Sequence, residues 1–279
     1  MTEVVSGLGA LAARYDILLC DVWGVIHNGR EAFPKACDAL IRWRAEIGPV
    51  ILISNAPRPQ GAVAEQLASL GVPRAAWTAI ATSGDVSRDL LSARAPGPAW
   101  RIGPAKDDPL FEDLGLTFAG PEAAAFIACS GPFDEDTETP EDYRAVLAIA
   151  AERRLEMICA NPDLVVQRGD SLIYCAGALA QLYERMGGKV IQAGKPFAPI
   201  YDLAIERAGA RDRTRVLTVG DGLLTDLAGA RAQGLDALFV ADGVHAAEVL
   251  DVTGDIDAAA LESVLVEYGP AFAIRSLAW

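Results

Sequence analysis

The sequence predicts an α/β protein in which a doubly wound parallel sheet carries an inserted, smaller α/β domain. Short continuous apolar runs at residues 17–20, 50–53 and 216–219 are typical of strands buried on both faces of a sheet. Segments with apolar residues at helical spacing follow these runs, and this alternation is typical of a doubly wound sheet. The alternation restarts after a Gly- and Pro-rich stretch at residues 84–103. A second α/β layer is therefore expected in the middle of the chain.

The amino-terminal part of the chain is expected to alternate helix and strand. Residues 3–14 suit a short leading helix, and the first strand follows it. Apolar residues recur at helical spacing from 36 to 47, before a strand at 49–54. A further helix is expected around residues 63–70, because Gly71 closes the apolar pattern there.

The middle of the chain repeats the alternation with shorter runs. Its expected strands are residues 100–103, 125–129 and 155–159, and its expected helices are 108–114 and 140–154. Before a short apolar tail, the carboxyl-terminal part is expected to alternate helix and strand at residues 177–186, 190–192, 199–208, 215–220, 223–232, 237–240 and 258–267.

The Gly- and Pro-rich transition marks the start of the inserted block. The family resemblance described below bounds that inserted domain at residues 85–180, which leaves residues 1–84 and 181–279 for the larger, doubly wound domain. At 279 residues the chain is long enough for a full hydrophobic core and for one or two domains.

Composition narrows the classes of function. The formal net charge of −14 disfavours nucleic acids and anionic membranes as partners, because both are bound through basic surfaces. No apolar run approaches the length of a membrane span, and the amino terminus lacks the basic region of an export signal. The five cysteines form no C-x-x-C pair and lie mostly in apolar segments, as expected of buried thiols in a reducing compartment. We therefore expect a cytoplasmic globular protein, and leave open whether it forms a homodimer.

One acidic residue marks the end of the first expected strand. Asp21 follows the apolar run directly, in the stretch D-V-W-G that ends at Gly24. In open α/β sheets, ligands bind outside the carboxyl ends of the strands. A carboxylate at this place is a candidate nucleophile or metal ligand, although Asp21 taken alone could equally cap a turn.

Three further signals follow expected elements in a fixed order. Ser54 and Asn55 end the second strand, Lys195 lies in G-K-P before a helix, and G-D-G-L-L-T-D at residues 220–226 ends another strand. Together with D-V-W-G, this ordered set resembles the haloacid dehalogenase superfamily of phosphatases, in the subclass with a type IIA cap. The resemblance implies a Rossmann-like core, with the residues at 85–180 as the cap.

Two more stretches of the inserted segment resemble the same subclass. These are N-P-D at residues 161–163 and C-A-G-A-L at residues 175–179. The resemblance therefore covers nearly the whole chain. Each motif is weak by itself, and the ordered set is specific.

The resemblance implies a phosphatase that acts on a small phosphorylated metabolite, such as a sugar phosphate, a nucleotide or an aryl phosphate. Asp21 is then the nucleophile that forms an aspartyl-phosphate, which water hydrolyses. Mg²⁺ is the implied cofactor, and its implied ligands are Asp21, Asp221 and the backbone carbonyl of Trp23. A hard cation is required because a carboxylate beside a phosphate dianion would be repelled.

The remaining motif residues have implied roles around the phosphate. Ser54 supplies a hydroxyl and Asn55 a backbone amide to a phosphate oxygen, and Lys195 neutralises the phosphate. Asp226 orients Lys195 or a water beside the metal. Each residue also has an ordinary structural alternative: a turn for Ser54 and Asn55, a surface lysine, and for Asp226 an acid favourable to a helix amino terminus.

Trp23 departs from the family pattern, which reads D-x-D-G at this place. The second Asp of that pattern protonates the leaving oxygen and later activates water. Loss of a general acid–base lowers rates by typically ~10²–10⁴-fold, or about 3–5 kcal/mol of barrier. Aryl and acyl phosphates should suffer least, because their leaving groups need no proton. His27 is a candidate substitute acid, although a loop histidine without a role is the simpler interpretation.

Two alternatives to an active phosphatase stay open. One is a catalytically impaired relative that binds a phosphorylated metabolite. The other is a metal-independent hydrolase such as a haloacid dehalogenase, whose motif also carries an aromatic residue at the position of Trp23. Asp221 in its G-D-x-x-x-T-D context favours the phosphatase over the dehalogenase.

Overall fold

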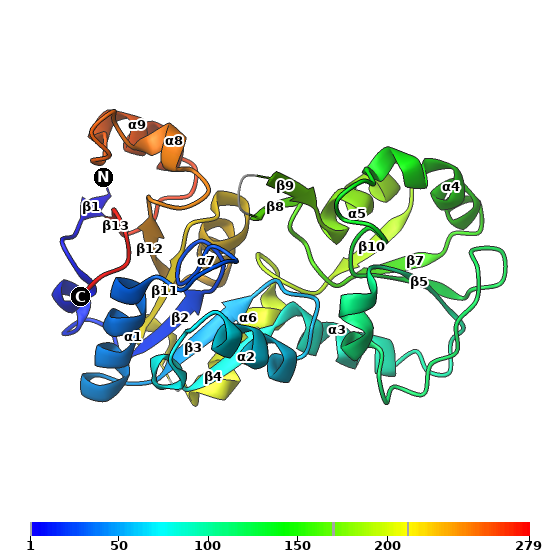
Figure 1. Ribbon diagram of the computed structural model, residues 1–279, viewed down its shortest axis with the longest axis horizontal. Coiled ribbons are helices and arrows are strands. Elements are labelled where there is room, and N and C mark those ends of the chain that lie inside the picture. Colours follow the sequence, from blue (N-terminus) through cyan, green and yellow to red (C-terminus); the bar gives the residue numbers. More distant parts are fainter. Residues whose placement is uncertain (1, 169–170, 211) are drawn as a thin grey trace. The chain divides into compact units, whose positions relative to one another are not determined.

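The computed structural model describes residues 2–168, 171–210 and 212–279, which form two compact units (Figure 1). We call them the seven-stranded unit and the four-stranded unit after their main sheets. The seven-stranded unit comprises the residues up to Ser54, Ala64–Ala81 and Lys195–Trp279, and the four-stranded unit comprises Asn55–Val63 and Thr82–Gly194. The predicted α/β class is confirmed.

The sheet of the seven-stranded unit has the order β1-β13-β12-β11-β2-β3-β4. Each neighbouring pair from β1 to β3 runs parallel. The chain winds outward from the centre in both directions, so β2 and β11 form the switch point at which ligands bind in such sheets. The strands are β1 Glu3–Val4, β2 Ile17–Asp21, β3 Val50–Ser54, β4 Ala79–Thr82, β11 Val216–Gly220, β12 Asp236–Val240 and β13 Phe272–Ile274.

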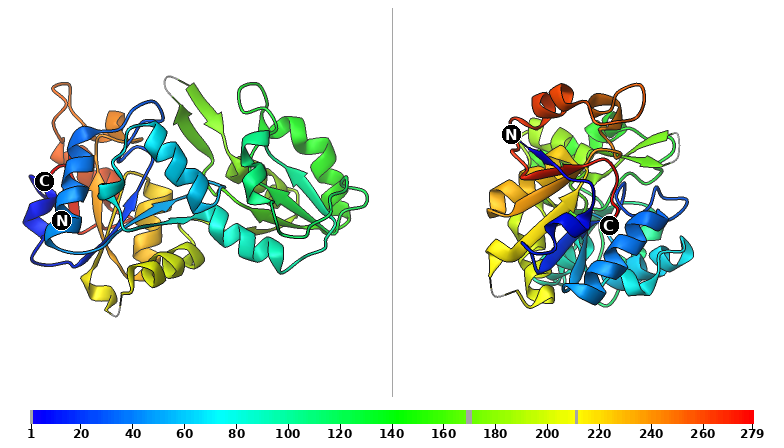
Figure 2. Two further views of the ribbon diagram at one scale, coloured as in Figure 1. Left: turned by 60° about the horizontal axis from the view of Figure 1, so that its bottom comes forward. Right: turned by 90° about the vertical axis from the view of Figure 1, so that its left-hand side faces the viewer.

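Helices lie on both sides of this sheet (Figure 2). Every residue of β2, β3 and β11 is buried, which explains their continuous apolar sequences. α1 begins at Pro34; proline is tolerated in the first turn because an amide there would have no partner within the helix. The helix buries an apolar stripe that includes Leu40 and Trp43. The helices are α1 Pro34–Glu46, α2 Gln60–Ser69, α6 Ala198–Ala208, α7 Ala228–Gln233, α8 Ala246–Val249 and α9 Ala258–Leu265.

The four-stranded unit contains a parallel sheet of order β10-β7-β6-β5. Alternate residues of β6 belong to two different apolar clusters: Ile127 and Cys129 pack with residues of α4 and α5, and Phe126 and Ala128 with Leu91 of α3. Both faces of the sheet are therefore covered. The elements are α3 Ser83–Ser92, β5 Ala99–Ile102, β6 Phe126–Cys129, α4 Arg144–Glu152, β7 Glu156–Cys159, α5 Ala176–Arg185 and β10 Lys189–Gln192.

The assignment of residues 181–279 to the larger domain implied that β10 joins the larger sheet, and this is wrong. It pairs in register with β7, Lys189 opposite Glu156 and Gln192 opposite Cys159. The second unit therefore extends to Gly194 rather than to residue 180. A short apolar run carries no information about which sheet it joins, because that depends on pairing with a distant strand.

Other elements also differ from the expectation; for example, the helix expected at residues 108–114 is a 3₁₀ helix at Ala105–Leu110. Residues 3–14 form β1 and a 3₁₀ turn at Leu8–Leu11 instead of a helix. A Cβ at Gly7 would lie 2.4 Å from the backbone of Trp279, so a tertiary contact with the chain end replaces local helical preference. The apolar tail contributes β13, to which β1 pairs. The antiparallel pair of β8 Val165–Arg168 and β9 Ser171–Tyr174 was not expected.

In the three described ranges, no helix is both long enough and apolar enough to cross a membrane.

Candidate active site

Two adjacent strands deliver carboxylates to the same edge of the seven-stranded sheet. Asp21 is the last residue of β2, and Asp221 follows β11 directly. Cys20 and Val219 are partners in the parallel register of these strands. Because neighbouring parallel strands end at the same edge, the register alone brings Asp21 and Asp221 together.

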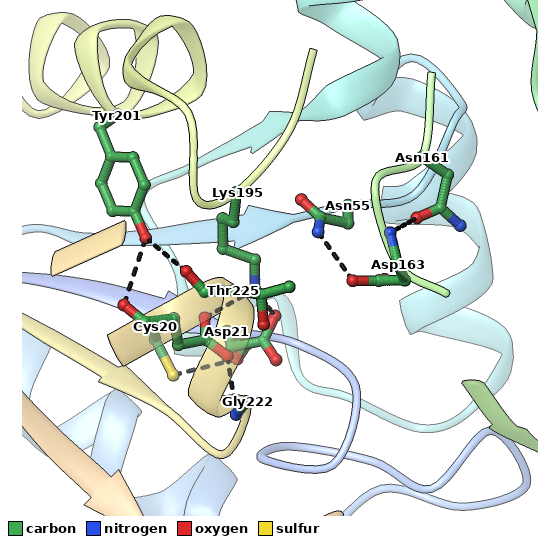
Figure 3. Close-up of polar contacts among 10 residues, drawn as sticks. Cys20, Asp21, Asn55, Asn161, Asp163, Lys195, Tyr201, Gly222 and Thr225 are labelled. Atoms are coloured by element: carbon green, nitrogen blue, oxygen red, sulfur yellow. Dashed lines mark hydrogen bonds and ion pairs between the residues drawn. The ribbon is translucent and has the colours of Figure 1, made fainter. Parts of the chain in front are cut away.

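Lys195 lies between two of the carboxylates (Figure 3). Its Nζ is 2.5 Å from Asp21 Oδ1 and 2.7 Å from Asp226 Oδ1. Only 3% of the lysine is exposed, so these are buried, charge-assisted hydrogen bonds. Lys195 is therefore a buried lysine and not a surface lysine.

Asp226 holds Lys195 from a π-helical turn that spans Leu223–Leu227. One of its carboxylate oxygens contacts the ammonium group, and the backbone amide of Gly222 donates to the other, at 3.1 Å. Asp226 is 4% exposed and contacts Lys195 rather than solvent. Asp226 therefore does more than an acid that only stabilises a helix amino terminus, because it also binds Lys195.

Asp221 sits in a tight backbone slot. The amide of Val244 donates to Asp221 Oδ2 at 2.8 Å. A Cβ at Gly24 would lie 2.3 Å from this oxygen, and a Cβ at Gly243 would lie 2.2 Å from it. Gly24 also has φ +83, which disfavours other residues. Glycine is therefore required at the last position of D-V-W-G, because a larger residue would collide with the Asp221 carboxylate.

The three carboxylates carry more negative charge than Lys195 can balance. Asp21, Asp221 and Asp226 each offer an oxygen, and these oxygens lie within 4.8 Å of one another. Burial, followed by repulsion from Asp226, raises the pKa of Asp21 well above its ordinary value, although Lys195 lowers it. Burial and then Asp226 raise the pKa of Asp221 to about 6. A buried cluster of carboxylate oxygens with excess negative charge fits a hard divalent cation.

Trp23 packs against a histidine of its own loop. The Trp23 and His27 rings meet edge to face, with centroids 5.1 Å apart. His27 is buried, which lowers its pKa to about 4, and its Nδ1 accepts a hydrogen bond from the amide of Gly29 at 3.0 Å. His27 is therefore neutral near pH 7 and is not the substitute acid considered from the sequence.

Ser54 and Asn55 fall in different units. Ser54 ends β3 beside Asp21, because Ile53 is the register partner of Asp21. Asn55 belongs to the four-stranded unit, where its Nδ2 donates to Asp163 Oδ1 at 2.8 Å. The role predicted for Asn55 uses its backbone amide. The side-chain contact with Asp163 holds Asn55, and with it that amide, in place.

Sequence reasoning missed two contacts of this site. The amide of Val244 at Asp221 follows β12, in a stretch that had no assigned role. Tyr201 on α6 contacts the backbone of Asp226 and had no assigned role either. The only signal for Tyr201 was its place in the helix that follows Lys195.

Comparison with known proteins points to one family. The model of haloacid dehalogenase-like hydrolases matches residues 18–117, and a second HAD-hydrolase-like model matches residues 192–269. The 5'-nucleotidase YutF of Bacillus subtilis is 26% identical over 82% of this chain and 88% of its own length. The two model matches span D-V-W-G, G-K-P and the residues around Asp221.

Solved structures agree with this assignment. The glycerol phosphate phosphatase of Mycobacterium tuberculosis, solved in complex with calcium, is 26% identical with a TM-score of 0.64, covering 84% of this chain and 68% of that one. A hydrolase of the haloacid dehalogenase-like family from Brucella suis 1330 is 42% identical with a TM-score of 0.87, covering 98% of this chain and 100% of the other. The chain therefore belongs to the haloacid dehalogenase-like hydrolase family.

Proposed function

We propose that this protein is a Mg²⁺-dependent phosphatase that hydrolyses a monoester of a small metabolite through an aspartyl-phosphate at Asp21. The observation that carries the proposal is the buried ammonium of Lys195 between Asp21 and Asp226, beside Asp221. Similar proteins are a 5'-nucleotidase and a glycerol phosphate phosphatase. Phosphoryl transfer needs a nucleophile, positive charge and donors for the phosphate oxygens, and this site offers each of them.

The reaction has two displacements at phosphorus. An oxygen of Asp21 attacks the phosphorus, and the bond from phosphorus to the ester oxygen breaks, so that oxygen leaves with the electron pair. Water then attacks the phosphorus of the aspartyl-phosphate, which releases inorganic phosphate and restores the Asp21 carboxylate. Lys195 holds Asp21 in place and neutralises the phosphate, while Asp226 fixes the lysine.

Asp21, Asp221 and the backbone carbonyl of Trp23 would hold the Mg²⁺ ion. The bound ion supplies positive charge that offsets the repulsion between the phosphate and the carboxylates. Ser54 contributes its hydroxyl and Asn55 its backbone amide to the phosphate oxygens. A metal-independent dehalogenase has no need of this charge excess, so the cluster favours the phosphatase.

The leaving group must depart without a proton from the protein. Trp23 occupies the position of the usual acid, and buried His27 is neutral near pH 7. We therefore propose that the leaving group is stable as an anion, such as the phenolate of an aryl phosphate. The four-stranded unit, which contains the expected cap residues 85–180, is assigned the role of the cap.

A leaving-group series tests this function. Aryl and alkyl phosphates are assayed with Mg²⁺ and with EDTA, in the wild type and in Trp23→Asp. We expect metal-dependent hydrolysis whose rate falls steeply as the leaving-group pKa rises. Trp23→Asp should raise alkyl turnover more than aryl turnover, toward the lower part of the ~10²–10⁴-fold range of acid–base catalysis. Brisk alkyl hydrolysis by the wild type would contradict the restriction.

Other results of the same series would identify the alternatives. Binding of phosphorylated ligands without hydrolysis would identify a binding protein. Hydrolysis that is insensitive to EDTA would identify a metal-independent enzyme.

We also propose that the protein is located in the cytoplasm. In the described ranges all five cysteines are free and buried, which suits a reducing compartment such as the cytoplasm. A homodimer is a further expectation, and sedimentation of the purified chain would decide it.

A further inference from the structure

Tyr201 is a buried residue near Lys195 for which the proposed chemistry gives no use. It lies on α6, in the helix that follows Lys195, and is 1% exposed. Its hydroxyl is 3.4 Å from the backbone carbonyl oxygens of Thr225 and Asp226 (Figure 3). Burial raises the pKa of the phenol, and the Asp226 carboxylate raises it further, so the hydroxyl keeps its proton and acts as a donor.

The two carbonyl groups belong to the π-helical turn that carries Asp226. In this turn the amide of Leu227 donates to Gly222 O at 3.1 Å, the spacing of a π-helix, and the amide of Asp226 donates to the same carbonyl at 2.9 Å. Isolated π-helical turns are rare and occur often at functional sites. A shared donor at the carbonyls of Thr225 and Asp226 stabilises a turn whose regular hydrogen bonding is disturbed.

Gly229 leaves room for the phenol at the next turn of the helix. A Cβ at this position would lie 2.1 Å from Tyr201 Oη and 2.6 Å from its ring carbon Cζ. Any larger residue would push the hydroxyl away from the two carbonyls. The close approach of Tyr201 is therefore built into α7 as well as into α6.

We propose that Tyr201 is a positioning residue that fixes the π-helical turn, so that Asp226 keeps Lys195 aimed at Asp21. Asp226 is then held from two sides, its side chain by the Gly222 amide and its backbone by the phenol. Tyr201 also ties the helix that follows Lys195 to the residue that binds Lys195. The inference rests on the proposed function, because Lys195 and Asp21 take part in chemistry only there.

A double-mutant cycle tests whether Tyr201 acts on Lys195 through Asp226. Tyr201→Phe removes only the hydroxyl, and Tyr183→Phe is the matched control, since the buried Tyr183 donates to Leu155 O at 2.6 Å in the four-stranded unit. We expect Tyr201→Phe to lower kcat by about 3- to 10-fold with KM within about twofold, as a small misplacement would. Tyr183→Phe should change neither. In the Asp226→Asn background, Tyr201→Phe should have no further effect on kcat.

Hydrogen exchange of the metal-free protein gives a readout that does not need activity. Amides in the stretch from Leu223 to Ala228 should exchange several-fold faster in Tyr201→Phe and at the wild-type rate in Tyr183→Phe. Unchanged exchange there would overturn the proposal, as would an equal loss of kcat in both backgrounds. If the wild type hydrolyses no phosphate ester, the proposed function fails, and exchange alone decides whether Tyr201 orders the turn.

Discussion

The two units use the ends of their parallel strands differently. In the seven-stranded unit, Asp21, Asp221 and Asp226 gather around Lys195. Among the described residues of the four-stranded unit, Asp107 is the one buried acid; it lies in the segment after β5 and is 1% exposed. The Ser130 side chain lies close enough to this carboxylate to lower its pKa.

Asp221 and Asp107 have similarly raised pKa values, although their neighbouring charges differ. Burial is the largest cause for both acids, and it raises each pKa to about 6. The next cause for Asp221 is repulsion from Asp226, whereas the next for Asp107 is the favourable charge of Lys106. A raised pKa therefore marks burial, and a site for phosphoryl transfer needs several acids and a lysine together.

We expect the largest effect when Lys195 of the seven-stranded unit is replaced, and we compare it with Lys106 of the four-stranded unit. Lys195→Met should lower kcat by at least ~10²–10³-fold, because it removes fixed positive charge where the phosphate reacts. It should also destabilise the fold, since two buried carboxylates lose their partner. Lys106→Met is the control: Lys106 forms an ion pair with Glu135 at 2.5 Å and is about half exposed. Enzyme assays and urea unfolding of both variants check this, and equal losses in both would contradict it.

A second contrast concerns the metal. Asp221→Asn should weaken Mg²⁺ binding by ~10²-fold or more, because loss even of groups behind the ligands costs typically ~10–100-fold. Asp107→Asn should leave the affinity unchanged. Isothermal titration calorimetry of folded proteins measures both, and an unchanged affinity in Asp221→Asn would remove Asp221 from the metal site.

The smallest effect is a pH dependence of stability. The folded pKa of Asp107, about 6, lies above the ordinary value of 3.8, so the folded state binds the proton more tightly. Its contribution to the free energy of unfolding is present below about pH 4 and is lost as pH rises to about 6. The difference corresponds to about 3 kcal/mol at most.

Asp107→Asn removes this titration. The variant should therefore gain stability relative to the wild type as pH rises from about 4 to 7. Urea unfolding across this range measures the difference. A constant difference between wild type and Asp107→Asn would show that Asp107 titrates normally.

Much of the fold followed from local patterns. The continuous apolar runs predicted β2, β3 and β11, because strands covered on both faces need no polar residues. The helical spacing around Leu40 and Trp43 predicted α1 for a similar reason, a single buried stripe. The family resemblance, and not a local pattern, implied that Asp21 and Asp221 share a site, and the register of β2 and β11 brings both residues to the same edge of the sheet.

Other features depend on contacts between distant residues. β1 forms because Glu3 and Val4 pair with β13, at the far end of the chain. β10 joins the second sheet because it pairs with β7. The contact of Tyr201 with Asp226 needs a π-helical turn and the absence of a side chain at Gly229. No local pattern of the sequence encodes such pairings.

The central claim is that Asp21 carries the phosphoryl group. Acid-quenched reactions of the wild type with an aryl phosphate and Mg²⁺ should contain a phosphorylated peptide that includes Asp21, detected by mass spectrometry. Asp21→Asn, which keeps the size of the side chain, should neither form this species nor hydrolyse the substrate. Hydrolysis by Asp21→Asn at the wild-type rate, or a phosphoryl group on another residue, would contradict the account.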